Sequence, residues 1–112
     1  MDLSLLQKAI DYGQGEFLLE DVVRFIEQGK MQLMELPENT LVVTEIVRYP
    51  RKSRLRVVLV AGRLTEQSID AIGTYARAYG LDGVEGSGRE GWGKVLEPKG
   101  FIKAYTTFIN DF

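Results

Sequence analysis

Residues 41–61 read LVVTEIVRYPRKSRLRVVLVA, with two runs rich in Val and Ile on either side of residues 50–53. β-Branched residues favour strands, and a proline followed by basic and small polar residues favours a turn. The stretch therefore predicts an antiparallel hairpin with strands near residues 41–49 and 55–61. Residues 56–61 are almost continuously apolar, so we expect the second strand at the centre of a sheet, covered on both faces.

The segments around this hairpin predict an α+β fold. Apolar residues at helical spacing predict a short helix that ends near Gly13 and a second helix from about residue 18 to 28. Thr65 can cap a third helix that Gly80 ends. The remaining expected elements are strands at residues 31–36, 84–86 and 101–112 and a short helix at residues 89–96. The order predicts one domain, residues 1–112, in which helices flank a central, mostly antiparallel sheet. Residues 1–17 form its N-terminal helix and loop, and residues 18–112 form its core.

The composition excludes several kinds of chemistry. The chain has no cysteine and no histidine. Thiol catalysis, disulfides, His-based metal sites and imidazole acid–base catalysis are therefore ruled out, and no metal site is predicted. Because no apolar run approaches the ~20 residues of a membrane span, we expect a soluble protein that does not bind membranes.

A basic cluster surrounds Tyr49 and Pro50 although the net charge is -2. Its members are Arg48, Arg51, Lys52, Arg54 and Arg56. A basic hairpin tip could contact nucleic acid or another partner, with Tyr49 stacking on a base. The same cluster could equally be a solvated turn that prevents edge pairing.

A glycine-rich segment, GSGREG at residues 86–91, matches the dinucleotide pattern G-x-G-x-x-G. That pattern functions between a buried strand and a helix that opens a larger nucleotide-binding unit. Here only a short strand precedes it, and Pro98 and Gly100 soon follow. We therefore predict a turn into a short helix that binds no dinucleotide.

The segment GREGWGKVLEPKGF at residues 88–101, together with the order of elements, resembles the GNAT family of N-acetyltransferases. The last helix of that family reads N-x-x-A-x-x-x-Y-x-K-x-G-F. Alignment on Gly100 places Arg89 at the Asn, Trp92 at the Ala and Leu96 at the Tyr. The resemblance implies a GNAT-like fold. At the start of the last helix, Arg89 and Trp92 could shape a ligand pocket, or the aromatic ring could instead fill the core.

Two departures from the GNAT pattern concern catalysis. In GNAT enzymes a glycine-rich loop holds the pyrophosphate of coenzyme A through backbone N–H groups. Here that loop is shortened, which leaves Gly62, Arg63 and Thr65 as the possible cofactor-binding residues. Leu96 also replaces the tyrosine that acts as general acid. Glu45 is the remaining candidate base, because it interrupts an apolar strand face. Alternatively, Glu45 pairs with a basic neighbour across the hairpin, such as Arg54 or Arg56.

The chain also resembles small GNAT-like proteins of tailed bacteriophages. The blocks that carry this resemblance include LEDV at residues 19–22, GKMQL at residues 29–33, ARAYG at residues 76–80 and GREGW at residues 88–92. It implies a virion-associated or interaction component, and the shortened loop and Leu96 predict a protein without acyltransferase activity or cofactor. Its expected partners are another phage or virion protein or a second copy of itself, in the host-cell cytoplasm and the virion. The alternatives are an acetyl-CoA-dependent N-acyltransferase and a nucleic-acid-binding protein that uses the basic hairpin.

Overall fold

The computed structural model describes residues 3–88 and 90–112. The elements are α1 (Leu3–Asp11), α2 (Leu19–Glu27), β1 (Gln32–Leu36), β2 (Thr40–Arg48), β3 (Ser53–Ala61), α3 (Glu66–Ala78), β4 (Gly83–Gly86), η1 (Glu90–Trp92), α4 (Gly93–Leu96) and η2 (Glu97–Lys99). The four strands form one sheet in the order β1-β2-β3-β4. The pairs β1–β2 and β2–β3 are antiparallel, whereas β4 runs parallel to β3. The predicted α+β class and the central hairpin are confirmed.

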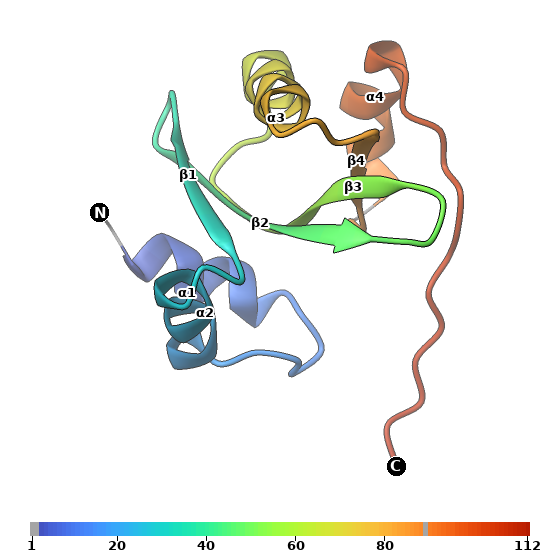
Figure 1. Ribbon diagram of the computed structural model, residues 1–112. Coiled ribbons are helices and arrows are strands. Elements are labelled where there is room, and N and C mark those ends of the chain that lie inside the picture. The colour runs from blue at the N-terminus through green and yellow to red at the C-terminus, as the bar shows by residue number, and fades with distance from the viewer. Residues whose placement is uncertain (1–2, 89) are drawn as a thin grey trace.

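Helices cover both faces of the sheet (Figure 1). On one face, Leu6 of α1 and Val22 of α2 pack with Val43 in a cluster whose members are at most 6% exposed. On the other face, Val42 and Leu55 pack against α3. Successive strand residues point to opposite faces, so neighbouring valines of β2 serve the two different cores.

Turn and cap residues set the limits of these elements. In the β1–β2 turn, Glu38 and Asn39 have φ of 62° and 59°, and two successive positive φ angles are typical of a tight hairpin turn. Thr65 caps α3 by accepting a hydrogen bond from the Ser68 backbone N–H at 3.1 Å. Gly80 follows the helix with φ of 70°, as expected for a glycine that ends a helix.

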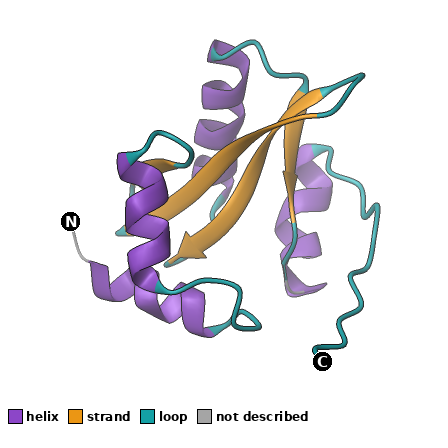
Figure 2. Cartoon of the chain, turned by 60° about the horizontal axis from the view of Figure 1, so that its bottom comes forward, coloured by secondary structure: helices purple, strands orange, loops and turns teal. Residues whose placement is uncertain are grey.

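The strands β3 and β4 pair over only part of the length of β3. The parallel register runs from Arg54 opposite Gly83 to Val57 opposite Gly86. Beyond Val57, residues 58–61 of β3 have no partner on the β4 side among the described residues, and the two strands diverge (Figure 2). A bulge at the same point leaves Val58 without an opposite residue in β2. We call the region beside residues 58–61 the β3–β4 split.

The expected strand at residues 101–112 is wrong. These residues form no helix or strand, and all except Phe101 are exposed. They run as an extended segment outside the layers of the fold (Figure 1). Strand propensity describes a side chain that fits a pleated, half-buried surface, and it produces a strand only where another strand pairs with it. The expected helix at residues 89–96 is also shorter, with the 3-10 turn η1 preceding a four-residue α4.

Candidate functional site: the split between β3 and β4

A hollow lies at the wide end of the β3–β4 split. Its volume is about 290 Å³, and it is lined by Leu5, Lys8, Ala9, Tyr12, Val60, Ala61, Gly62, Leu64 and Trp92. Leu5, Lys8 and Ala9 belong to α1, and Tyr12 directly follows that helix. Val60 and Ala61 end β3, Gly62 and Leu64 lie in the loop after it, and Trp92 belongs to η1. The hollow therefore brings together three parts of the chain that are far apart in sequence.

The lining is mostly apolar, with polar groups at its rim. Lys8 and Tyr12 are exposed, whereas Leu64 and Trp92 are half-buried. Sites for drug-sized ligands are usually ~300–1,000 Å³, so this hollow is at the lower limit of that range. It can accept a small apolar group beside a cation, but not a whole dinucleotide-sized molecule.

The glycine-rich segment supports Trp92. A Cβ atom at Gly88 would overlap the indole of Trp92, whereas a Cβ atom at Gly91 would meet nothing within 4 Å. Gly86 ends β4 opposite Val57. As predicted, a short helical segment, η1 followed by α4, comes after β4, and one glycine of the glycine-rich segment makes room for a tryptophan. Arg89, the other residue expected to shape the pocket, lies outside the described residues.

The loop between β3 and α3 has only four residues, 62–65. Gly62 has φ of +103°, and a Cβ atom there would lie 2.9 Å from the backbone oxygen of Asn39. The Thr40 hydroxyl donates to the Arg63 carbonyl oxygen at 3.0 Å. The Thr65 side chain is used for the cap of α3, and Glu66 adds a negative charge to the first helical turn. The loop is short, as predicted, and its Thr65 cap uses one of the N–H groups at the start of α3.

Leu96, which occupies the place of the GNAT tyrosine, ends α4. Its carbonyl oxygen accepts a hydrogen bond from the Phe101 backbone N–H at 3.3 Å. A leucine side chain has no proton to donate, so this position cannot supply a general acid.

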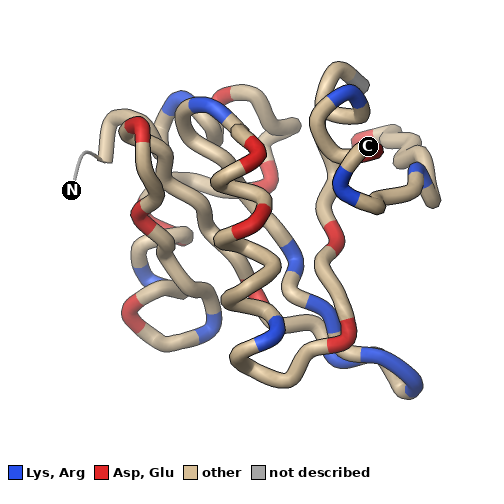
Figure 3. Tube along the Cα trace, turned by 90° about the horizontal axis from the view of Figure 1, so that it is seen from above, with Lys and Arg blue, Asp and Glu red and all other residues tan. Residues whose placement is uncertain are grey.

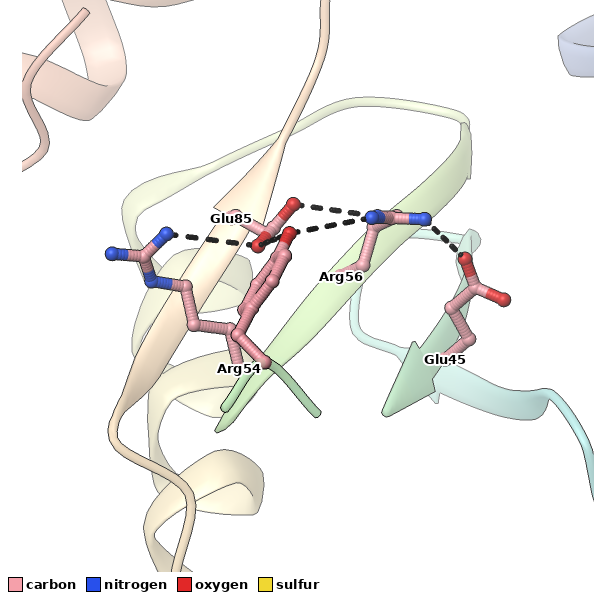
Figure 4. Close-up of polar contacts among 5 residues, drawn as sticks. Glu45, Arg54, Arg56 and Glu85 are labelled. Atoms are coloured by element: carbon pink, nitrogen blue, oxygen red, sulfur yellow. Dashed lines mark hydrogen bonds and ion pairs between the residues drawn. The ribbon is translucent and has the colours of Figure 1, made fainter. Parts of the chain in front are cut away.

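Charged and phenolic side chains form a network across β2, β3 and β4 (Figure 4). The Arg56 guanidinium contacts Glu45 at 2.8 Å and Glu85 at 3.3 Å. It also donates to the Tyr49 hydroxyl at 3.4 Å, and that hydroxyl donates to Glu85 at 2.7 Å. The hydrogen bond with Tyr49 and the two carboxylates outweigh burial, so the pKa of Arg56 is raised.

The interpretation that Glu45 pairs with a basic neighbour across the hairpin is confirmed. Glu45 is not among the residues that line the hollow. Its carboxylate is held by Arg56, and the network ties three strands together at the narrow end of the split. Glu45 as a catalytic base stays a prediction.

The basic cluster divides into two groups. Arg54 contacts Glu85 at 3.7 Å, and Arg56 belongs to the same network. Arg48, Arg51 and Lys52 are exposed. Basic positions mark the projecting corner formed by the β2–β3 turn (Figure 3). The surface available to a nucleic acid or a partner is therefore smaller than the five residues suggested.

The described residues contain no group of three or more acidic side chains that could hold a metal ion. In the described part of the chain, no helix is long and apolar enough to cross a membrane.

The fold has counterparts among solved structures. A probable acetyltransferase superposes with a TM-score of 0.70 at 15% identity, over 98% of this chain and 91% of that one. An acetyltransferase of Trypanosoma brucei gives 0.67 at 14%, over 99% and 93%. The protein TTHA1254 of Thermus thermophilus gives 0.63 at 19%, over 99% and 90%. The chain has a GNAT-like fold. No protein-family model matches it, and no curated protein sequence matches it.

Two parts of this site were not predicted from the sequence. Lys8 and Tyr12 were expected only as parts of a packing helix and its loop, yet they line the hollow. Glu85 binds two arginines and a tyrosine of the hairpin. One signal for Glu85 was present, because a carboxylate inside a very short strand beside a basic hairpin suggests an ion pair.

Proposed function

We propose that this chain is a GNAT-fold interaction protein that does not transfer acyl groups and that acts in a bacteriophage particle or its assembly. The observation that carries the loss of acyl transfer is the short loop at residues 62–65. It has only four residues, its Arg63 carbonyl oxygen accepts a hydrogen bond from Thr40, and its Thr65 side chain binds the Ser68 N–H at the start of α3. A pyrophosphate needs several free N–H groups at that place.

The fit of coenzyme A to these residues is poor for three reasons. The Thr65 hydroxyl already binds the Ser68 N–H, the space beside Gly62 is filled by Asn39 and Thr40, and Glu66 brings a negative charge to the start of α3. The hollow of about 290 Å³ accommodates only part of such a molecule. Leu96 offers no proton. The phage setting is supported by the sequence resemblance to small GNAT-like phage proteins, and the partners we propose are another virion protein and a second copy of the chain.

Calorimetry with acetyl-CoA tests the loss of activity. We expect no saturable heat at sub-millimolar ligand and no mass shift on a panel of amines and peptides. Each missing hydrogen bond to a charged group costs about 1.5–3 kcal/mol. Two or three of them weaken binding roughly a hundredfold or more. Acetyl transfer that disappears in Glu45→Gln would overturn the proposal. The phage setting is tested by mass spectrometry of purified particles, in which peptides of this chain are expected.

A second candidate function, acyl-CoA-dependent N-acyl transfer, is favoured by one observation. The β3–β4 split is open, and the hollow at its wide end has an apolar lining with a lysine at the rim. The same calorimetry decides between the two functions, because binding that is lost in Lys8→Glu and kept in Lys52→Glu would locate a ligand in this hollow.

A further inference from the structure

Residues 101–112, which we call the tail, expose five large apolar side chains. Their exposed fractions are 85% for Ile102, 90% for Tyr105, 91% for Phe108, 54% for Ile109 and 116% for Phe112. Monomeric proteins rarely expose apolar side chains in such a contiguous group unless the group is an interaction site. The tail therefore needs a surface to cover it.

The sequence of the tail is typical of a strand. Eight of its twelve residues are Phe, Ile, Tyr or Thr, the types enriched in strands. In an extended chain, Ile102, Phe108 and Phe112 point to one side, while Tyr105 and Ile109 point to the other together with Lys103 and Asp111. Both sides of such a strand would carry apolar side chains, which a covering surface would remove from water.

The sheet has an edge that can receive such a strand. In the order β1-β2-β3-β4, and among the residues that the structure describes, β4 has a neighbour only on the β3 side. The outer edge of β4 thus presents backbone groups that can pair with another chain. The segment Gly83–Gly86 contains no proline, so each of its residues keeps its N–H group.

The start of the tail is fixed to the body of the protein. The Lys99 ammonium pairs with Asp70 of α3 at 3.1 Å, and the Phe101 N–H bonds to Leu96. From there the tail runs outside the layers rather than along β4 (Figure 1). A second copy can cover it without disturbing these contacts, whereas pairing with its own β4 would require the tail to leave this course.

We propose that the tail of one copy adds as a strand to the β4 edge of a second copy, and that the exchange is reciprocal. Each copy has one tail and one edge, so the two-fold exchange closes as a dimer. This proposal rests on the proposed function, because it names the partner of the interaction protein.

The area available agrees with a stable dimer. Each tail carries three aromatic side chains that are at least 90% exposed, and a buried aromatic residue removes about 150–250 Å² from water. Two tails and the surfaces that they cover then bury roughly 1,800 Å² or more, within the usual range of ~1,200–2,000 Å² for stable interfaces.

Sedimentation of the full chain between about 1 and 200 μM tests the dimer, because interfaces of this size bind in the micromolar range or tighter. We expect the double variant Phe108→Asp/Phe112→Asp to weaken association roughly a hundredfold or more. Both residues are exposed, so its circular dichroism should be unchanged. The matched control Leu18→Asp replaces another exposed apolar residue, 62% exposed on α2's N-terminal side, and should dimerise normally. A chain that stays monomeric throughout the range, or a double variant that dimerises normally, overturns the proposal.

Cysteine cross-linking tests the position of the tail, since the chain has no cysteine of its own. Ser87→Cys lies directly after β4, and Thr107→Cys lies in the tail. Mixing the two single variants under oxidising conditions should give a covalent heterodimer. If the two changes in one chain instead give an intramolecular disulfide at high dilution, the tail covers its own β4 and the proposal is wrong.

Failure of the proposed function gives a different result. A dimer that transfers acetyl groups would refute the proposed function and leave the exchange of tails intact. A monomer that neither binds acetyl-CoA nor transfers acetyl groups would refute the exchange of tails and leave the proposed function intact.

Discussion

Replacing Gly62 by alanine should destabilise the protein by about 2–4 kcal/mol. Its φ of +103° is a conformation that alanine adopts only with strain, which costs about 1–3 kcal/mol. The new Cβ atom would also lie 2.9 Å from the Asn39 carbonyl oxygen and 3.2 Å from Thr40. Moving Thr40 weakens its hydrogen bond to Arg63, a further loss of about 0.5–1.5 kcal/mol.

Urea denaturation of three glycine variants separates the cost of backbone strain from the cost of the contact with Asn39 and Thr40. Gly91→Ala has neither a positive φ nor a close neighbour and should change the unfolding free energy by less than about 0.5 kcal/mol. Gly80→Ala has φ of +70° in open space, so it should cost about 1–2 kcal/mol from backbone strain alone. If Gly62→Ala costs no more than Gly80→Ala, with equal m-values, the contact with the β1–β2 turn contributes nothing and our reasoning about this loop is refuted.

Four further outcomes are expected. Arg56→Met should lower the unfolding free energy measured in urea by about 1 kcal/mol, because it breaks a network with three partners. Added salt should make this loss smaller, and an equal loss at high salt would contradict the prediction. Burial, followed by a hydrogen bond with a neighbouring tyrosine, raises the pKa of Tyr75 from 10.0 to about 12. The folded state therefore holds this proton more tightly, so the resulting stability is complete below pH 10.0 and is lost as the pH rises toward about 12; Tyr75→Phe should flatten that part of the stability profile. Gly88→Ala should displace the indole of Trp92 and shift the fluorescence of this single tryptophan, and nucleotides should give no saturable signal with either protein. Duplex DNA should bind weakly to the hairpin tip, with affinity that falls steeply with salt and is lost in Arg51→Glu; tight binding at physiological salt would favour the nucleic-acid function.

Much of the fold could be predicted because its pairings are local. The strands of the central hairpin are joined by residues 49–52, so their pattern and turn specify the register almost alone. The cross-strand pairing of Glu45 was anticipated for the same reason. Helix caps such as Thr65 are equally local, since the capping side chain and the N–H that it binds are three residues apart.

The remaining features depend on contacts between distant residues. Glu85 reaches Arg56 because β4 returns parallel to β3 after the α3 crossover, and no short pattern specifies where such a strand stops. Tyr12 lines the hollow because α1 packs against β3, a contact between segments that are distant in sequence. The tail was misjudged because propensity indicates which residues suit a strand but not whether an edge is within reach.

The parallel β3–β4 pair has a consequence for the route by which the protein folds. The antiparallel strands β1, β2 and β3 are joined by short turns, so they can form with little loss of chain entropy. The strand β4 can add only after the whole of α3 has been placed, which makes its pairing the least local in the sheet. We infer that the antiparallel strands β1, β2 and β3 are structured in the transition state for folding and that β4 pairs with β3 after it. Mutations in the hairpin core, such as Val43→Ala, should then slow folding, whereas Val84→Ala should mainly speed unfolding. The last contacts to form would also be the first to open, so the walls of the split would be the part of the native protein most ready to adapt to whatever it binds.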